Sequence, residues 1–164
     1  MNLRAKQTDR PITRDGITLY QPADFAGMRA AGKLAAEILD EVGALVQPGV
    51  TTGELAAFIE ARVTQAGATS ATIGYKGYEH ASCISVNHVV CHGIPGEKRL
   101  REGDILNIDV TVILDGWFGD NSRMYWAGHA PKRAQRLSQI THDALMKGIE
   151  QVKPGNTFGD IGAA

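Results

Sequence analysis

The stretch from residue 107 to residue 123 places the strongest constraint on how this chain folds. A run of β-branched and apolar residues leads into Asp115-Gly116, and a second strand-like run follows. Asp-Gly between two such runs predicts a β-hairpin with a two-residue turn. The register of that hairpin gives these cross-strand pairs: Leu114 with Trp117, Thr111 with Asp120, and Asp109 with Ser122.

Two aspartates of this predicted hairpin, Asp109 and Asp120, share one face of the sheet. They are diagonal neighbours, so their Cα atoms should lie roughly 7–8 Å apart, with the carboxylates free to converge. Aspartate is depleted inside strands, and two like charges on one face repel each other unless a cation lies between them. A metal site explains the pair, and so does a solvated hairpin face whose carboxylates point at water. From the hairpin alone the two interpretations are about equal.

Apolar residues at helical spacing predict three helices. Met28 belongs to the apolar stripe of the first helix and is expected in the core. The second helix should begin with a capping box formed by Thr51 and Glu54. The predicted helices cover about residues 22–46, 52–66 and 131–152.

Short strands joined by loops are predicted between the second helix and the hairpin. They are expected at residues 72–75, 82–86 and 89–91. His92 comes directly after the last of them. A strand end is a place where a rigid scaffold presents functional groups, so His92 is a candidate site residue.

The sequence contains an internal repeat. Residues 46–57 align without gaps with residues 152–163, with identical valine, proline, threonine and two glycines. A long amphipathic helix is predicted before each copy, so the repeat indicates a duplicated unit of helix, helix and antiparallel sheet. Because the second copy has barely begun at Ala164, we expect the chain to be the N-terminal fragment of a longer protein.

The composition argues against several classes of function. The net charge of −1 at pH 7 gives no global field that would attract DNA or a membrane. Cys83 and Cys91 are too few for a disulfide framework and fit a reducing, cytoplasmic setting. Neither a membrane-spanning apolar run nor the apolar segment of a signal peptide is present. Residues 1–16 are polar and aperiodic, which predicts a flexible arm.

Four runs of residues together resemble bacterial type I methionine aminopeptidases. They are Tyr-Lys-Gly-Tyr at 75–78, Cys-Ile-Ser-Val-Asn-His-Val-Val-Cys-His-Gly-Ile-Pro at 83–95, Gly-Asp-Ile-Leu-Asn-Ile-Asp-Val at 103–110, and Gly-Asp-Asn-Ser at 119–122. The similarity covers residues 17–164, as the N-terminal portion of the catalytic domain. It implies an α/β (α+β) pita-bread fold, a pseudo-twofold duplication of helix, helix and antiparallel sheet, cut off after its first half.

The resemblance also implies an activity, the removal of the initiator methionine from newly made proteins. Asp109 and Asp120 match ligands of two divalent metal ions, which could be cobalt, manganese, iron or zinc. His92 matches a histidine that contacts the substrate and assists the reaction. The pocket for the methionine side chain is matched by Tyr75, Tyr78 and Cys83.

Further expectations follow from the same resemblance. Asn87 and Val89 match positions whose carbonyl groups hold a monovalent cation in some members. The implied partners are the N-termini of nascent polypeptides, with a transient contact to the ribosome, and the complete protein is expected to be a monomer. Complete members take a histidine and two glutamates from their second half as further ligands, so this chain is expected to be inactive as given.

Two other interpretations of the residues stay open. The same fold serves as a non-catalytic peptide-binding module in proteins that have lost their metal ligands, although the retention of Asp109, Asp120 and His92 argues against it. It also occurs in proline-specific peptidases. Those enzymes usually carry a separate N-terminal domain, whereas here the first predicted helix follows only a short arm.

Overall fold

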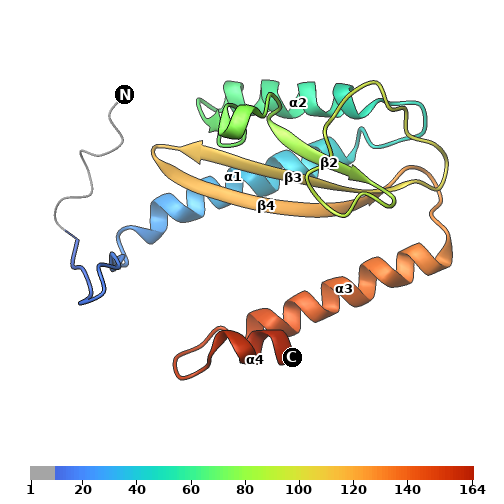
Figure 1. The fold of residues 1–164 in the computed structure, drawn as a ribbon. Coiled ribbons are helices and arrows are strands. Elements are labelled where there is room, and N and C mark those ends of the chain that lie inside the picture. Colours follow the sequence, from blue (N-terminus) through green and yellow to red (C-terminus); the bar gives the residue numbers. More distant parts are fainter. Residues whose placement is uncertain (1–9) are drawn as a thin grey trace.

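The structure, a computed structural model, describes residues 10–164. Two helices, a four-stranded antiparallel sheet and two further helices follow one another along the chain (Figure 1). The elements are α1 (Phe25–Gly43), α2 (Thr52–Gln65), β1 (Thr69–Ser70), the 3-10 turn η1 (Tyr75–Gly77), β2 (Ser82–Val86), β3 (Ile105–Leu114), β4 (Trp117–Trp126), α3 (Lys132–Glu150) and α4 (Phe158–Ala163). None of the helices described here is long and apolar enough to cross a membrane.

Most of the predicted N-terminal arm lies outside the described residues, which begin at Arg10. The Arg10 guanidinium is paired with the Asp24 carboxylate at 2.8 Å, directly before α1. The Thr13 N–H donates to the Ile17 carbonyl oxygen at 2.8 Å and closes a turn between Arg10 and Asp24. The flexibility of the arm stays a prediction.

The local signals predicted the two N-terminal helices well. The capping box of α2 is confirmed, because the Glu54 carboxylate accepts the Thr51 N–H at 2.7 Å while the Thr51 hydroxyl oxygen accepts the Glu54 N–H at 3.1 Å. The core position expected for Met28 is wrong, since its side chain is 53% exposed. The buried face of α1 begins only at Ala31, one turn farther along the helix.

The sheet is organised around β3. Both β1 and β2 pair with one side of β3, and β4 pairs with the other side, all antiparallel. The predicted hairpin register is confirmed at all three pairs, with Leu114 opposite Trp117, Thr111 opposite Asp120 and Asp109 opposite Ser122. Asp115 and Gly116 form the turn, both with positive φ.

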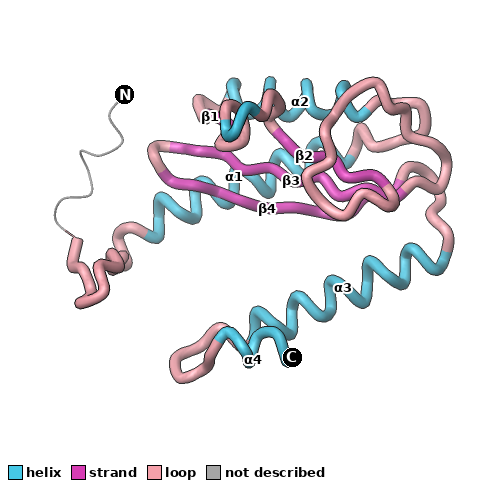
Figure 2. The backbone as a smooth tube through the Cα atoms, in the orientation of Figure 1, coloured by secondary structure: helices cyan, strands magenta, loops and turns pink. Residues whose placement is uncertain are grey.

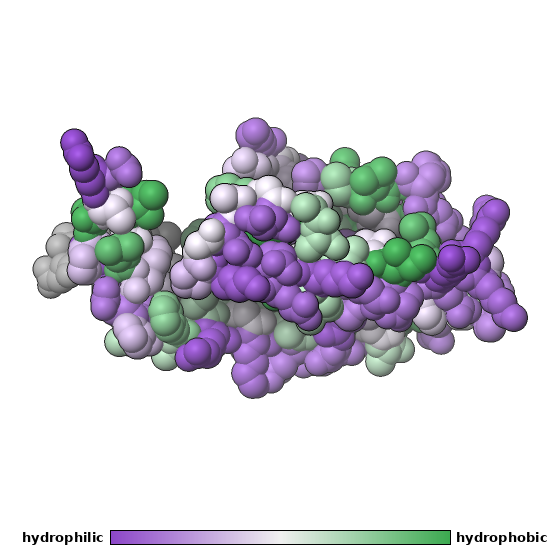
Figure 3. Space-filling view, turned by 90° about the horizontal axis from the view of Figure 1, so that it is seen from below, coloured by the Kyte–Doolittle hydropathy of each residue, from purple (hydrophilic) through white to green (hydrophobic). Residues whose placement is uncertain are grey.

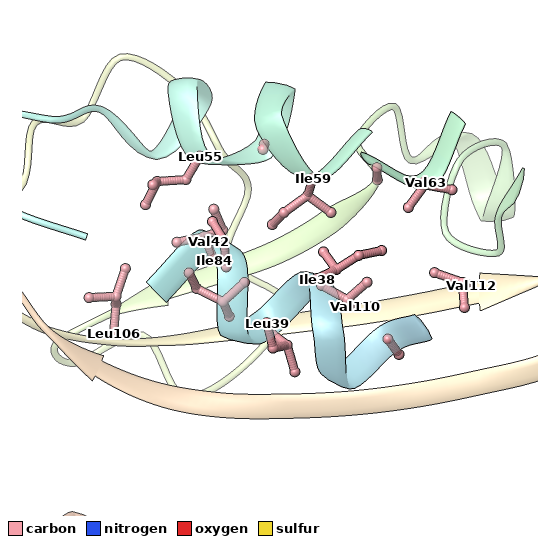
Figure 4. Close-up of a cluster of buried hydrophobic side chains, with 14 of the residues drawn as sticks. Ile38, Leu39, Val42, Leu55, Ile59, Val63, Ile84, Leu106, Val110 and Val112 are labelled. Carbon is pink, nitrogen blue, oxygen red and sulfur yellow. The ribbon is translucent and has the colours of Figure 1, made fainter. Parts of the chain in front are cut away.

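Helices α1 and α2 cover one face of this sheet and enclose the core between themselves and the strands (Figures 1 and 4). Alternate residues of β3 point into that core and are fully buried, as expected for a strand with a period of two. These core residues of β3 are Leu106, Ile108, Val110 and Val112. They meet Ile38, Leu39 and Val42 of α1 and Leu55, Ile59 and Val63 of α2.

Two of the predicted short strands are wrong, whereas the strand at 82–86 is confirmed as β2. Residues 72–75 run into the turn η1, because Gly74 has a left-handed backbone with φ of 85°. Residues 89–91 are a loop, because Asn87 turns the chain away from the sheet with φ of 57°. His92 therefore lies in a loop and not at a strand end.

The internal repeat is visible in the backbone. Helices α1 and α3 each contain 19 residues, and the glycines that follow them, Gly49 and Gly155, have φ of 95° and 93°. The backbone N–H of Thr157 then donates to the Asp160 carboxylate, just as the N–H of Thr51 donates to Glu54. Matching geometry at matching positions supports the duplicated unit.

Helices α3 and α4 pack on each other and lie apart from the sheet (Figures 1 and 2). Apolar side chains of α3 are consequently exposed, among them Leu137, Ile140, Leu145 and Ile149. From below, the surface is hydrophilic across its middle, and apolar groups gather toward its two ends (Figure 3).

Close contact between α1 and β4 requires Gly119. A Cβ added there would lie 2.1 Å from the Ala31 carbonyl oxygen, whereas a Cβ at Gly32 of α1 would meet nothing within 4 Å. We expect Gly119→Ala to lower the free energy of unfolding by about 1–3 kcal/mol, because the helix must move away from the sheet. The matched change Gly32→Ala should raise it by about 0.5–1 kcal/mol. Chemical denaturation of both variants checks this, and equal effects would contradict the close contact.

Candidate metal centre

The hairpin brings Asp109 and Asp120 together on the sheet face that points away from the core. Asp109 follows the buried Ile108 on β3, and Asp120 lies opposite Thr111 on β4. The Thr111 hydroxyl donates a hydrogen bond to Oδ1 of Asp120 at 3.1 Å. Besides the effect of burial, Asp120 raises the pKa of Asp109 through its charge and a side-chain hydrogen bond, so the two carboxyl groups converge as predicted.

The pKa of the Asp109 carboxyl is shifted by its surroundings. Burial raises the pKa of the Asp109 carboxyl above its ordinary value, and the neighbouring charge of Asp120 raises it further. His92 acts in the opposite direction and lowers that pKa. A half-buried carboxyl group beside a second carboxylate, with an imidazole nearby, forms a set of donors suited to a cation.

His92 is held beside this pair by an unusual backbone. Its φ of 55° lies in the left-handed region, which costs a residue with a side chain about 1–2 kcal/mol. The next residue, Gly93, is fastened to β2: its carbonyl oxygen accepts the Ile84 N–H at 2.9 Å and its own N–H donates to Ser85 Oγ at 3.0 Å. A Cβ on Gly93 would lie 2.2 Å from the Ile84 carbonyl oxygen. Only glycine allows the loop to approach this closely.

Cys83 and Tyr78 lie on the other side of Asp109. Cys83 is the β2 residue paired with Asp109 and is nearly buried. The Tyr78 hydroxyl donates to the Ser82 carbonyl oxygen at 2.9 Å. Burial raises the pKa of Tyr78, and the neighbouring Cys83 and Asp109 raise it further, so the phenol stays protonated at neutral pH. These two side chains form a soft, partly apolar wall beside the carboxylates.

Tyr75 is joined to this group through its backbone, since its carbonyl oxygen accepts the Tyr78 N–H at 3.0 Å, while its side chain points into solvent. It begins the turn η1, is 66% exposed, and has the Lys76 ammonium 5.5 Å from its ring centre. The structure thus gathers five of the six predicted site residues. They are Asp109, Asp120, His92, Cys83 and Tyr78.

Asn87 and Val89, the predicted cation-binding pair, lie in the loop that follows β2. Both polar atoms of the Asn87 side chain are hydrogen-bonded, because Nδ2 donates to Asp104 at 2.8 Å and Oδ1 accepts the Ile105 N–H at 3.1 Å. Val89 N–H donates to the Val86 carbonyl oxygen at 3.2 Å. These bonds fix the loop, and a cation-binding role for the pair stays a prediction.

The donor set for a metal ion is partial in this chain. Between residues 10 and 164, no cluster of three or more histidine, cysteine, aspartate or glutamate side chains is arranged to hold one. Asp109 and Asp120 nevertheless fit a divalent ion chemically, since they are hard oxygen donors whose mutual repulsion a cation would relieve. Other ligands would have to complete the site.

Two supporting residues were missed by the sequence analysis. Thr111 was placed opposite Asp120 by the register, so its hydrogen bond could have been anticipated from the pairing alone. The role of Ser85 could not be predicted from the sequence, because its hydrogen bond to Gly93 depends on the course of an irregular loop. Loop geometry of this kind has no periodicity to detect.

Comparison with known proteins gives close matches over nearly the whole chain. The methionine aminopeptidases of Rickettsia prowazekii and Escherichia coli K12 are 54% and 47% identical to it, each over 90% of this chain and 57% of their own length. The crystal structure of the Rickettsia protein superposes with a TM-score of 0.87, covering 88% of this chain and 58% of that one. The methionine aminopeptidase from Thermotoga maritima, at 35% identity, gives 0.83, covering 87% and 57%.

These matches confirm the predicted resemblance and the predicted pita-bread fold, and the chain spans less than two thirds of the length of the relatives it matches. The profile of the metallopeptidase family M24 matches residues 26–164. The chain therefore belongs to metallopeptidase family M24.

Proposed function

We propose that this chain forms the N-terminal part of a metal-dependent methionine aminopeptidase, which removes the initiator methionine from newly made proteins in the cytoplasm. The observation that carries the proposal is the convergence of Asp109 and Asp120 on one sheet face beside His92. The names of its relatives support the same activity. Nascent polypeptides would be its partners, with a transient contact to the ribosome, and the complete protein would act as a monomer.

In this proposal Asp109 and Asp120 hold divalent metal ions. Such ions supply Lewis-acid activation of water and of the scissile carbonyl when bound. His92 contacts the substrate near the scissile peptide and can hold or donate a proton there. An oxygen-rich site with one imidazole nearby does not select sharply among manganese, iron, cobalt and zinc. Asn87 and Val89 would hold a monovalent cation through their carbonyl groups.

Cys83 and Tyr78 would recognise the methionine side chain of the substrate. Sulfur and aromatic groups make favourable contacts with a thioether, and both residues lie beside Asp109. Tyr75 would join them only if substrate binding draws its exposed ring inward. Each missing methylene costs about 1–3 kcal/mol in such a pocket, so the selectivity for methionine would be finite.

A chimera tests the activity directly. Residues 1–164 are fused to the part of the Rickettsia prowazekii relative that lies beyond the aligned region, and methionine release from Met-Ala-Ser is measured with manganese or cobalt. We expect the chimera to release methionine and the 164-residue chain alone to release none, because its donor set is partial. Asp109→Asn in the chimera should lower kcat/KM by at least about a hundredfold, since a metal ligand is lost.

The matched control is Asp115→Asn. Asp115 lies in the hairpin turn with φ of 50°, a conformation that asparagine adopts readily, so this change should leave kcat/KM unaltered. A folded chimera that binds peptide but releases no methionine would favour the peptide-binding module instead. Release from the isolated chain would contradict the proposed division of the ligands.

Thr111 should matter through Asp120, whose carboxylate it orients. Residues that fix a ligand typically contribute 10- to 100-fold to metal affinity. We expect Thr111→Val to weaken manganese binding to the chimera by about tenfold or more, and Thr111→Ser to keep it near the starting value. Isothermal titration calorimetry measures both, and similar losses for valine and serine would point to packing in place of the hydrogen bond.

Without metal, the Asp109 carboxyl should make the stability of the chain depend on pH. The folded chain keeps the proton of Asp109 to a higher pH than the unfolded chain does, because the pKa of Asp109 is raised on folding. The unfolded chain binds fewer protons in that window, so the free energy of unfolding falls as the pH rises from the ordinary aspartate pKa through the raised one.

Asp109→Asn removes this titrating group. We expect the metal-free variant to lose that part of the pH dependence and to be more stable than the starting chain at pH 7. Denaturant titrations at several pH values in the presence of a chelator measure the difference. Identical profiles for the two chains would show that Asp109 ionises freely in the folded state.

A further inference from the structure

We propose that Ser85 is a positioning residue that fixes the orientation of His92. The inference rests on the proposed function only for its importance to catalysis, because the positioning itself concerns the chain without metal or substrate. It starts from one hydrogen bond, in which Gly93 N–H donates to Ser85 Oγ at 3.0 Å.

Ser85 is well placed to act on the loop. It lies on β2 and is only 4% exposed. Its partner on β3 is Asn107, and two residues before it Cys83 pairs with Asp109, so Ser85 and Asp109 share the face of the sheet that bears the carboxylates. The hydroxyl therefore binds the loop from the same surface that holds the candidate metal ligands.

The bond acts on His92 through the peptide plane. The Gly93 N–H and the His92 carbonyl group belong to one planar unit, so fixing the N–H fixes one of the two peptide planes that meet at the His92 Cα and restricts its ψ angle. The Ile84 N–H holds the following carbonyl group at 2.9 Å. With both peptide units of Gly93 anchored to β2, the position of the His92 Cα is set, which limits the directions in which the His92 side chain can leave the backbone.

The left-handed backbone of His92 makes such an anchor necessary. A non-glycine residue keeps a φ of 55° only where its surroundings enforce it. If the anchor at Gly93 N–H is lost, His92 can relax to a right-handed or extended conformation, which turns the imidazole away from Asp109. Ser85 would thus hold a strained conformation that the site requires.

A second buried serine on the same strand gives a matched comparison. Ser82 is fully buried, and within the described structure its hydroxyl has no hydrogen-bond partner. It pairs with Val110 and so faces the core, on the opposite side of the sheet from Ser85. Removing either hydroxyl changes the volume of β2 equally, but only one removal releases the loop.

The test uses nuclear magnetic resonance on the full 164-residue chain, isotopically labelled, without metal and at one fixed pH. Two signals are followed, the hydrogen exchange of the Gly93 amide and the chemical shifts of the His92 imidazole. We expect Ser85→Ala to speed hydrogen exchange of the Gly93 amide about three- to tenfold. This factor corresponds to the free energy of one typical hydrogen bond. The His92 shifts should move toward those of an unstructured peptide. Ser85→Thr should restore both signals, and Ser82→Ala should leave both unchanged.

Several outcomes overturn the inference. Unchanged His92 shifts in Ser85→Ala would show that the imidazole is held by other contacts, and equal changes in Ser82→Ala would show a general loosening of β2. If Ser85→Ala does not fold, Ser85→Cys carries the test, because sulfur is a weak acceptor and should give intermediate exchange. An inactive chimera together with displaced His92 shifts would reject the proposed function and keep the positioning role, so the two can fail separately.

Discussion

The alternation of side chains along β3 is the constraint on which the rest of this structure depends. Successive residues of a strand point to opposite faces, so one ten-residue strand supplies both the centre of the core and the centre of the candidate site. Ile108 and Val110 are fully buried under α1 and α2, while Asp109, between them, faces the other way. The packing free energy of the core thus fixes the position of a carboxylate that contributes little to stability itself.

The candidate site contains two energetically unfavourable features, and the rigid sheet supports both of them. Asp109 and Asp120 repel each other, and His92 holds a left-handed backbone. Each feature costs free energy in the isolated chain, and both are tolerated because the sheet and the Gly93 contacts to β2 are fixed by other interactions. Strain and charge repulsion concentrated at one place are typical of functional sites, and a bound cation would relieve the repulsion.

Short-range signals with a clear physical basis predicted much of this fold. The Asp-Gly turn set the hairpin register, and the capping residues and Pro-Gly turns marked the helix ends and the duplication.

The wrong predictions share one cause, which is that a local sequence pattern does not show what packs against it in the fold. Val89 and Val90 favour a strand locally, yet no strand among residues 10–164 pairs with them, and Asn87 turns the chain into a loop. Periodicity placed Met28 on the apolar stripe, but the buried face of α1 begins only at Ala31. Likewise, Asp109 and Asp120 were found through strand register, whereas the hold of Ser85 on the His92 loop depends on irregular backbone that no pattern encodes.

The double use of β3 also limits how such a protein can change over evolutionary time. An inserted or deleted residue between Ile105 and Leu114 would shift every later side chain to the opposite face, burying Asp109 in the core or bringing a valine to the site. Substitutions can accumulate there one position at a time, but changes of length cannot. Length variation is instead expected where nothing alternates and no site residue is held, as in the turn at Asp115.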